Sequence, residues 1–327
     1  MKTKVLVTGA GGFIGSHLVE KLVQKGYKVK GFVHYNSKNS WGWLEDSKYK
    51  DNVEVISGDI RDQDIIRYAM RDVDTVYHLA ALIGIPYSYI SPEAYVDTNI
   101  KGSLNIFQAA KELGVKRVIH TSTSEIYGTA QFVPIHEQHP INPQSPYAAS
   151  KSAADFIGLS FFRSFDLPVT VVRPFNTYGP RQSARAIIPT IITQILSGHK
   201  SIKLGSLTPT RDLTFVEDTA EGFICAGESL SVGGEVVNLG ANSEISVGDL
   251  AQLIGHLLNV SITIVEDSVR KRPSKSEVDR LMADNSKAKS ILNWSPEKSL
   301  EQGLKKTIEW FQEADRLKKY KSEIYNV

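Results

Sequence analysis

The sequence predicts an α/β protein with a doubly wound parallel sheet and a smaller C-terminal domain. In the first half of the chain, short β-branched runs alternate with longer segments of helical period, a pattern typical of a parallel sheet covered by helices on both faces. The runs are continuously apolar, as burial on both faces requires. The expected strands span residues 4–8, 28–33, 53–57, 75–79, 117–121 and 169–173.

The length of 327 residues corresponds to about two domains. The regular alternation ends after Arg173, so we place a domain change near Pro174. Beyond it, loop-rich stretches separate shorter elements. The last stretch has apolar residues at helical spacing from Leu300 to Phe311, which predicts a packed amphipathic helix.

Composition and charge exclude several classes of protein. Hydrophobic residues make up 41% of the chain and charged residues 23%, close to the averages of globular proteins. The net charge of +2 gives no basic field for nucleic acid. No run of about 18 apolar residues is present, so we expect no membrane span. With Cys225 as the single cysteine there is no intrachain disulfide, and we expect a cytoplasmic protein without a metal site.

A glycine-rich loop follows the first expected strand and opens a helix. Glycines stand at positions 9, 12 and 15, with Phe13 and Ile14 between the last two. Glycine allows positive φ and lets a pyrophosphate approach the backbone at a helix N-terminus. Because of its position between the first strand and the first helix, this loop predicts dinucleotide binding.

The end of the second expected strand bears on the choice between NAD and NADP. An acidic residue usually stands there in NAD-specific folds, whereas this chain has Tyr35 and Asn36, followed by Lys38. The choice therefore stays open, with NAD as our expectation. Asp59, just past the third strand, either touches the adenine ring or caps the following helix.

Tyr147 and Lys151 are four residues apart at the start of a helical pattern, so both lie on one helix face. The pKa of a free tyrosine, about 10, is too high for a base at neutral pH, and a nearby ammonium would lower it. Upstream, the strand end 120–128 is rich in hydroxyls and carries one carboxylate, Glu125. Ligands of open α/β sheets bind at the carboxyl ends of strands, so these groups point toward the cofactor.

The chain resembles the extended short-chain dehydrogenase/reductase family of nucleotide-sugar enzymes in its glycine loop, at 78–81, Asn99, Thr123, Tyr147 and Lys151, and at 173–181, 211–218 and 283–288. The resemblance implies a Rossmann domain over 1–174 and a domain mainly for the nucleotide sugar over 175–327, with part of 212–243 returning to the first. It also implies a homodimer.

The resemblance further implies roles for individual residues. The cofactor would contact Gly9, Gly12, Phe13, Ile14, Gly15, Tyr35, Asn36, Asp59, Ile60, Leu79, Ala80, Ala81, Asn99, Tyr147 and Lys151. The substrate would contact Tyr87, Thr123, Asn176, Arg181, Arg211 and Arg272. Tyr147 would take the proton of the sugar 4-hydroxyl, Thr123 would bind the same oxygen, and Lys151 would bind the nicotinamide ribose and lower the pKa of Tyr147. Arg211 could instead be a surface cation beside Asp212.

Glu125 favours a particular reaction. A carboxylate beside Thr123 can remove the acidic C5 proton of a 4-keto sugar, after which loss of the 6-hydroxyl and hydride return to C6 give a 4-keto-6-deoxy sugar. Many sugar-nucleotide dehydratases have Asp-Glu here, whereas this chain has Ser124 and Glu125. We count both as catalytic, with Thr123, Tyr147 and Lys151.

The Ser-Glu pair resembles GDP-mannose dehydratases and also UDP-glucuronate decarboxylases, which need a cation such as Arg181, Arg185 or Arg272 for the substrate carboxylate. Segments 35–45 and 121–130 look most like the enzymes that act on UDP-N-acetylglucosamine (UDP-GlcNAc) in legionaminic and pseudaminic acid pathways. We therefore expect an NAD(P)-dependent UDP-GlcNAc 4,6-dehydratase. The open alternatives are a reductase/C5-epimerase of a 5,6-unsaturated derivative, a UDP-glucuronate decarboxylase and a 4-epimerase. A non-catalytic dinucleotide sensor is disfavoured.

Two surfaces have both a functional and a structural interpretation. The segment 82–87 follows the fourth strand and should line the C5 and C6 side of the sugar, although Ile83 and Ile85 could equally pack in the core. The helices that carry Tyr147 and residues 99–113 would form the dimer interface. Residues of the second helix suited to that interface, or equally to the core of a monomer, are Leu104, Ile106, Phe107 and Ala110.

Overall fold

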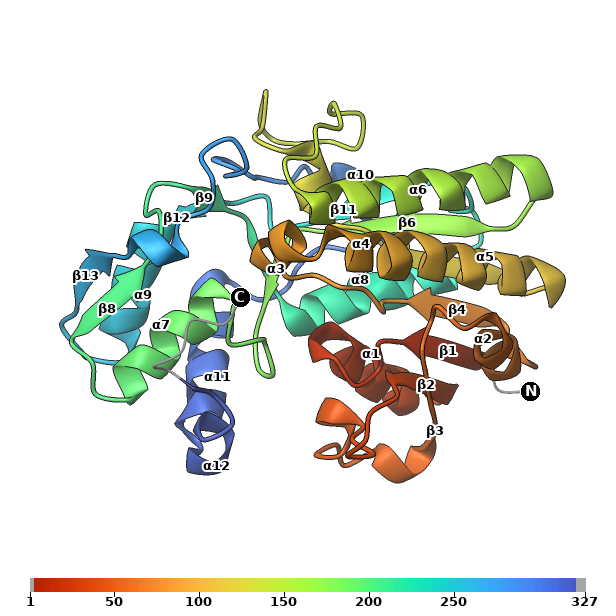
Figure 1. Ribbon diagram of the computed structural model, residues 1–327, viewed down its shortest axis with the longest axis horizontal. Coiled ribbons are helices and arrows are strands. Elements are labelled where there is room, and N and C mark those ends of the chain that lie inside the picture. Colours follow the sequence, from red (N-terminus) through yellow and green to blue (C-terminus); the bar gives the residue numbers. More distant parts are fainter. Residues whose placement is uncertain (1–2, 322–327) are drawn as a thin grey trace.

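Seven parallel strands form the central sheet of the computed structural model, which describes residues 3–321 (Figure 1). In spatial order they are β11 (Val236–Leu239), β6 (Val169–Pro174), β5 (Arg117–Thr121), β4 (Thr75–His78), β1 (Lys4–Thr8), β2 (Lys28–His34) and β3 (Val53–Gly58). Each of the six predicted strands begins at its predicted residue and ends within one residue of its predicted end. The doubly wound parallel fold is therefore confirmed.

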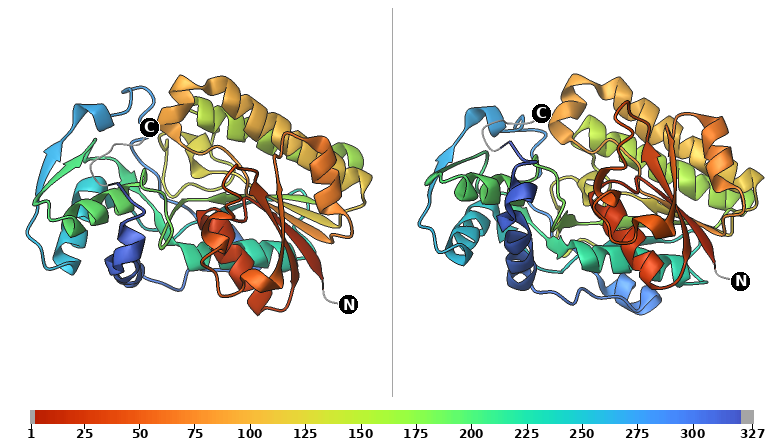
Figure 2. Two further views of the ribbon diagram at one scale, coloured as in Figure 1. Left: turned by 60° about the horizontal axis from the view of Figure 1, so that its bottom comes forward. Right: turned by 90° about the horizontal axis from the view of Figure 1, so that it is seen from below.

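Helices cover both faces of this sheet, as Figure 2 shows. One face carries α1 (Phe13–Gln24), α8 (Val216–Glu228) and α10 (Ser286–Leu292). The other carries α2 (Gln63–Met70), α5 (Gly102–Glu112) and α6 (Pro146–Phe165). Each face has its own apolar core, so the strands are buried from both sides.

A third apolar core belongs to the part of the chain beside the sheet in Figure 1. Its helices are α7 (Ile187–Leu196), α9 (Val247–Leu257), α11 (Leu300–Gln312) and α12 (Ala314–Leu317). Its strands pair as β8 (Ser201–Leu204) with β13 (Thr263–Glu266), β10 (Leu213–Phe215) with β7 (Asn176–Tyr178), and β12 (Ile245–Ser246) with β9 (Thr210–Arg211). The predicted amphipathic helix is α11, which buries Leu304, Ile308 and Phe311. We propose the domain division 1–174 and 175–327, with α8 and β11 lying on the first domain.

Short helical segments connect these elements: η1 (Gly42–Leu44), η2 (Lys50–Asn52), α3 (Ile85–Ile90), α4 (Pro92–Tyr95), η3 (Val96–Lys101), η4 (Ser124–Tyr127) and η5 (Ser268–Arg270). None of the helices within residues 3–321 is both long and apolar enough to cross a membrane.

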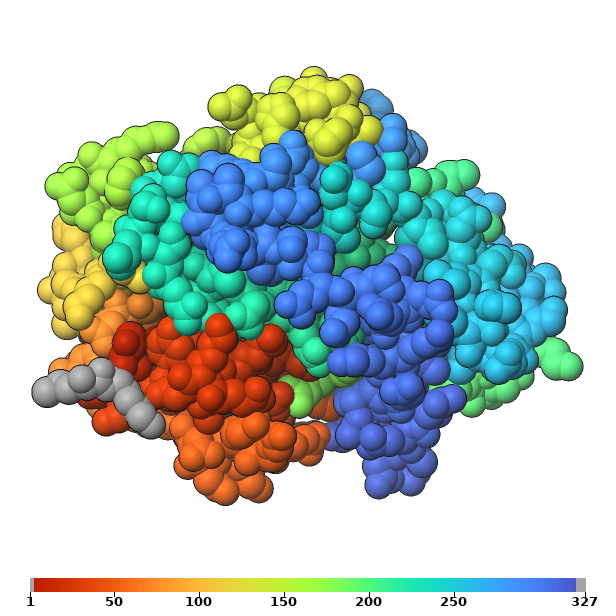
Figure 3. Space-filling model, turned by 180° about the vertical axis from the view of Figure 1, so that it is seen from behind, coloured from red at the N-terminus to blue at the C-terminus, as the bar shows by residue number. Residues whose placement is uncertain are grey.

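The C-terminal helices also contact the first domain. In Figure 3 the dark blue end of the described chain lies against the orange residues that follow β2. There, the Trp43 and Trp310 rings meet edge to face at 5.5 Å, and Lys319 pairs with Asp46 at 2.6 Å. This contact joins the two domains beside the glycine loop, because the Trp43 backbone N–H donates to the Gly11 carbonyl at 3.0 Å.

The structure decides between the two roles left open for α5. Ile106, Phe107 and Ala110 are fully buried in the chain's own core, and Leu104 packs against that core. The three fully buried side chains therefore belong to the core of the single chain, as one of their two interpretations predicted.

Candidate active site

A cavity of about 1210 Å³ lies between the carboxyl ends of the strands and the C-terminal domain. The order of the sheet reverses between β1 and β4, and such a switch point is where open α/β sheets bind ligands. The cavity extends from the glycine loop, past the ends of β2, β3 and β4, to β9 and the segment 270–277.

The glycine loop fits a dinucleotide. Gly9 has φ of +70°, and a Cβ at Gly15 would lie 2.1 Å from the Gly9 carbonyl oxygen, so larger residues are excluded at both positions. Gly12 caps α1 without a side-chain hydrogen bond, so the N-terminal backbone of α1 faces the cavity. The backbone thus forms a cradle that fits a pyrophosphate at a helix N-terminus.

Gly11 makes a close backbone contact with segment 41–43 that the sequence did not predict. A Cβ at residue 11 would lie 2.2 Å from the Trp41 carbonyl oxygen, and one at Gly42 would lie 2.4 Å from the Gly11 oxygen. The extra glycine therefore lets segment 41–43 pack directly on the cofactor loop, and Trp41 lines the cavity beside it.

Most of the predicted cofactor residues line the cavity. They are Gly9, Gly12, Phe13, Ile14, Gly15, Asn36, Asp59, Ile60, Leu79, Ala80, Ala81, Tyr147 and Lys151. Tyr35 does not, because it follows the end of β2 on the outside of the molecule and its side chain is 71% exposed. Asn99 does not either: it is fully buried, and its amide bonds both backbone groups of Leu82 and the Ser150 hydroxyl.

The end of the cavity near β2 and β3 has no free carboxylate among the described residues. Asp59 lines it, but its carboxylate receives two side-chain nitrogens of Arg61 at 2.6–3.0 Å, and this hydrogen bonding lowers the pKa of Asp59. The cap of α2 is Asp62, so the alternative role of Asp59 as a helix cap is excluded. Both donors and the acceptor of the Asn36 amide are used within its own loop.

Thr123, Tyr147 and Lys151 line the cavity together. Thr123 caps η4, and the two other side chains project from the first turns of α6. Burial raises the pKa of Tyr147 above its ordinary value, and a hydrogen bond with Thr123 opposes the rise. The sequence predicted the opposite direction, from Lys151. That predicted direction is wrong for this structure because the Tyr147 phenol packs against Ile85 and Tyr95. The effect of burial on its pKa is larger than the opposing effect of the hydrogen bond with Thr123.

Lys151 is also buried, and burial lowers the pKa of its ammonium to about 8, against the opposing effect of Asp155. Below that pH the side chain is charged; above it the charge is lost. The site therefore depends on a cation that titrates close to neutrality.

We expect kcat/KM to fall as the pH rises through about 8, because Lys151 loses the charge that favours tyrosinate at Tyr147. In Lys151→Arg the fall should move to higher pH, since a guanidinium stays protonated. In Lys151→Met it should disappear, leaving a low activity that rises with pH as the phenol ionises unaided. A wild-type profile that stays flat through this range would contradict the assignment.

A charged network beneath the site supports α6. Asp155 is fully buried one turn after Lys151, and it accepts from Ser122 at 2.7 Å and from Arg173 at 3.2 Å. His120 lies 3.3 Å from its other oxygen. Arg173 was predicted only as part of a motif, and the structure shows that it neutralises the buried carboxylate.

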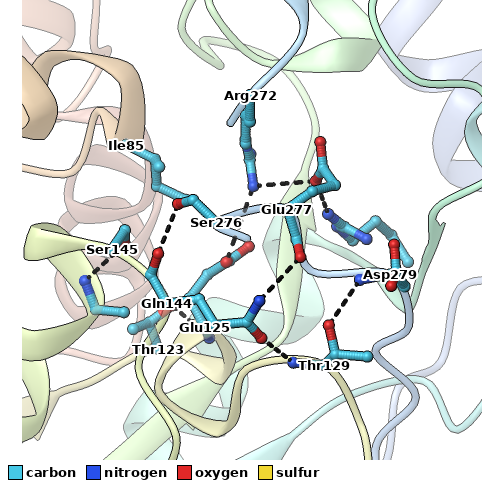
Figure 4. A network of polar contacts seen from close by, with 12 residues as sticks. Ile85, Thr123, Glu125, Thr129, Gln144, Ser145, Arg272, Ser276, Glu277 and Asp279 are labelled. Atoms are coloured by element: carbon cyan, nitrogen blue, oxygen red, sulfur yellow. Dashed lines mark hydrogen bonds and ion pairs between the residues drawn. The ribbon is translucent and has the colours of Figure 1, made fainter. Parts of the chain in front are cut away.

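Ser124 and Glu125 follow Thr123 into the same cavity, and the Glu125 side chain is only 10% exposed. Figure 4 shows Arg272 reaching toward Glu125 and Glu277 from the C-terminal domain. Its Nη1 lies 4.0 Å from Glu125 Oε2 and 3.5 Å from Glu277 Oε1. Arg211 donates to the same Glu277 oxygen at 3.2 Å. Glu277 was not predicted: Arg272 stands only five residues before it, but Arg211 comes from a distant segment, and no motif shows that the three side chains meet.

The predicted substrate residues divide into two groups. Thr123, Asn176, Arg211 and Arg272 line the cavity, and the buried Oδ1 of Asn176 has no hydrogen-bond partner in the described part of the chain. Arg211 is 9% exposed, which rules out its alternative role as a surface cation.

The other two predicted residues lie outside the cavity lining. Arg181 is held away from the cavity by Glu20 at 2.9 Å and Ser16 at 3.1 Å on α1. Tyr87 packs against Tyr95 at the back of the segment 82–86 instead of lining the cavity. Ile83 and Ile85 do line it, and Ile85 is also buried against Tyr95 and Tyr147, so both of its interpretations hold.

Comparisons with known proteins place this site in context. A family model described as GDP-mannose 4,6 dehydratase matches residues 6–307. A UDP-N-acetyl-alpha-D-glucosaminuronate decarboxylase of Bacillus cytotoxicus is 34% identical over 96% of this chain and 99% of its own.

Two solved structures have the same architecture. One is a UDP-N-acetylglucosamine 4-epimerase from Methanobrevibacter ruminantium in complex with UDP-N-acetylmuramic acid, with 32% identity, a TM-score of 0.85 and coverage of 95% of this chain and 99% of that chain. The other is a dTDP-glucose 4,6-dehydratase from Streptomyces venezuelae with NAD bound, with 29% identity, a TM-score of 0.86 and coverage of 95% and 97%. The names of these relatives cover three reactions, so the reaction has to be argued from the side chains.

Proposed function

The chain belongs to the family described as GDP-mannose 4,6 dehydratase, among the extended short-chain dehydrogenase/reductase enzymes of nucleotide sugars, and on that premise we propose that it is an NAD-dependent 4,6-dehydratase of UDP-GlcNAc. One observation carries this proposal: the carboxylate of Glu125 lines the same cavity as Thr123, Tyr147 and Lys151. A 4-epimerase has no use for a base at that position, because it only returns hydride to C4.

The cofactor's place follows from the cavity. Gly9, Gly12 and Gly15 would hold the pyrophosphate of NAD. Residues 79–81 would lie along the part of NAD between the pyrophosphate and the nicotinamide, which would be near Tyr147. When bound, NAD supplies the acceptor and later the donor of hydride, together with a positive charge that favours tyrosinate. The S. venezuelae dehydratase, which has a similar fold, was solved with NAD bound, and this supports NAD as the cofactor.

Tyr147 takes the proton of the sugar 4-hydroxyl, which allows the carbon to become a ketone. Thr123, whose hydroxyl bonds the Tyr147 phenol, holds the same sugar oxygen. Lys151, one turn further along α6, supplies the cation that stabilises the ionised phenol.

Glu125 then removes the C5 proton, which the new ketone has made acidic. The bond from C6 to its oxygen breaks, and the oxygen leaves as water with a proton. Glu125 can pass the proton that it has just taken to the leaving oxygen. No second acid is therefore needed at position 124, where many dehydratases have an aspartate and this chain has Ser124. The Ser124 hydroxyl, buried beside it, can donate a hydrogen bond to the leaving oxygen. Hydride return to C6 and addition of a solvent-derived proton at C5 complete the 4-keto-6-deoxy sugar. Tyr147 releases to solvent the proton that it took from the 4-hydroxyl, so the protons balance.

The diphosphate of the substrate would lie next to Glu125, toward β9 and the segment 270–277. Arg211 and Arg272 are suited to a diphosphate, since guanidinium groups bind phosphate oxygens in pairs. The unpartnered Oδ1 of Asn176 is an acceptor for a substrate hydroxyl or amide. Relatives that act on UDP sugars support uridine as the base.

The test is to incubate the purified protein with UDP-GlcNAc in deuterated water and to follow the sugar nucleotide by mass spectrometry. We expect loss of one water and uptake of one deuterium at C5. An unchanged substrate would contradict the proposal and favour an enzyme that acts on a 5,6-unsaturated sugar made by another protein. Conversion to UDP-N-acetylgalactosamine without loss of water would indicate a 4-epimerase.

Decarboxylation of a UDP-linked uronate is the second candidate, because a further cation lines the sugar end of the cavity. Arg185 Nη1 lies 2.8 Å from the point where a Cβ of residue 84 would be, so the guanidinium rests on Gly84. The B. cytotoxicus relative is named as a decarboxylase of such a sugar. Release of carbon dioxide from UDP-N-acetylglucosaminuronate, with UDP-GlcNAc unchanged, would establish this reaction instead.

We also propose a homodimer in the cytoplasm. Its interface would use the outer surface of α5 and α6, where Phe156 is 55% exposed and the neighbouring Val96 is 43% exposed. The single cysteine is compatible with a reducing compartment.

A further inference from the structure

Four charged side chains meet where the sugar and the diphosphate of the proposed substrate would join, and two of them are carboxylates. Arg211, Arg272, Glu125 and Glu277 are each no more than a quarter exposed. Their charges sum to zero, so the cluster is balanced before any substrate enters. A diphosphate would bring two negative charges into this space.

Glu277 therefore opposes the binding of the nucleotide. Its carboxylate occupies one face of both arginines that suit the diphosphate, at 3.2 Å from Arg211 and 3.5 Å from Arg272. Like charges a few ångströms apart repel each other, more strongly where water is excluded. Because Glu277 weakens nucleotide binding, we expect its charge to have a role that compensates for this repulsion.

The distances around Arg272 indicate that role. Its Nη1 is nearer to Glu277, at 3.5 Å, than to Glu125, at 4.0 Å. Without the negative charge of Glu277, the guanidinium would be drawn to Glu125 alone. A tight ion pair there would cover the oxygen that has to reach the C5 proton.

The backbone that carries Glu277 is fixed to the first domain, as Figure 4 shows. The Gln144 side chain donates to the Lys275 and Glu277 carbonyls at 3.0 Å each, and it accepts from the Thr129 N–H. The Ser276 hydroxyl donates to the Gln144 carbonyl at 2.6 Å. Gln144 stands three residues before Tyr147, so its hydrogen bonds fix the backbone of Glu277 relative to the reacting groups.

We propose that Glu277 is a positioning residue: its charge weakens the binding of the substrate diphosphate, and in return it keeps Arg272 away from Glu125. The second half of this inference rests on the proposed function, because it concerns the base for C5. The first half concerns only the binding of the nucleotide.

The test is Glu277→Gln in the NAD-loaded protein, because glutamine keeps a hydrogen-bond acceptor and removes the charge. UDP, measured by calorimetry, should bind about fivefold tighter because one repulsive charge is gone. At the same time, kcat with UDP-GlcNAc and the exchange of the C5 proton with solvent should fall by about 10- to 100-fold, since Arg272 moves onto the base. Glu277→Asp should restore both values toward those of the unaltered chain.

A matched control is available in Glu244→Gln. Glu244 is exposed to a similar extent, 18% against 16%, and pairs with Arg280, but it lies outside the cavity lining. The Glu244→Gln variant should change neither UDP affinity nor turnover.

If Glu277→Gln weakens UDP binding or leaves it unchanged, or if affinity and kcat fall together, the inference is overturned. Failure of the proposed function is a separate result, namely an unaltered chain that does not dehydrate UDP-GlcNAc.

Discussion

Replacing Tyr147 by phenylalanine should reduce dehydration of UDP-GlcNAc by about 10²–10⁴-fold, the usual contribution of a general acid or base. The phenol is the group in the cavity placed with both Thr123 and Lys151 to take the 4-hydroxyl proton. Without that step no ketone forms at C4, and the C5 proton is not acidic enough to be removed. Both the loss of water and the exchange of the C5 proton should therefore disappear together.

The Tyr147→Phe chain should fold normally and keep its NAD, because the glycine loop and Lys151 are untouched. Tyr87→Phe is the matched control. Tyr87 packs in the same aromatic cluster but outside the cavity, so its variant should turn over at the wild-type rate. Full activity of Tyr147→Phe would exclude oxidation at C4 by this site.

Replacing Glu125 by glutamine should lower dehydration by a similar factor, about 10²–10⁴-fold, through a different step. Oxidation at C4 needs only Tyr147, Thr123 and Lys151, so it should continue. A 4-keto sugar nucleotide that still has its 6-oxygen should accumulate on the protein and be found by mass spectrometry after rapid quenching. Exchange of the C5 proton with deuterated water should be lost.

Glutamine fits the position of Glu125 and can still accept from the surrounding donors, so a loss of folding is not expected. Ser124→Ala provides the comparison: the neighbouring hydroxyl only supports the leaving oxygen, and its variant should lose much less activity. If Glu125→Gln dehydrates UDP-GlcNAc at the full rate, Glu125 is not the base for C5.

The sequence predicted the sheet well because its strands are buried on both faces. The apolar run Val5–Val7 lies between the polar residues Lys4 and Thr8, and the run that begins at Val169 is bounded by Pro168 and Pro174, so the limits of both are readable without tertiary information. The groups around Tyr147 were also predictable, because the four-residue spacing of Tyr147 and Lys151 and the hydroxyl-rich strand end at 120–128 are local features of the sequence.

What the sequence could not supply depends on long-range geometry. Tyr35 and Arg181 have suitable chemistry, but the outward turn after β2 and the pairing of Arg181 with Glu20 remove them from the cavity. Glu277 and Arg211 are 66 residues apart, so their contact is not visible in any motif. The rise in the pKa of Tyr147 comes from burial, which a pattern of residue types does not measure.

The most direct test of the central claim uses UDP-GlcNAc that carries deuterium at C4. The account predicts that the purified protein converts it to a 4-keto-6-deoxy product with that deuterium at C6, because hydride leaves C4 and returns to C6 within one active site. Deuterium found again at C4, in a product that has kept its 6-hydroxyl, would show epimerisation and contradict the assignment of Glu125 as the base for elimination.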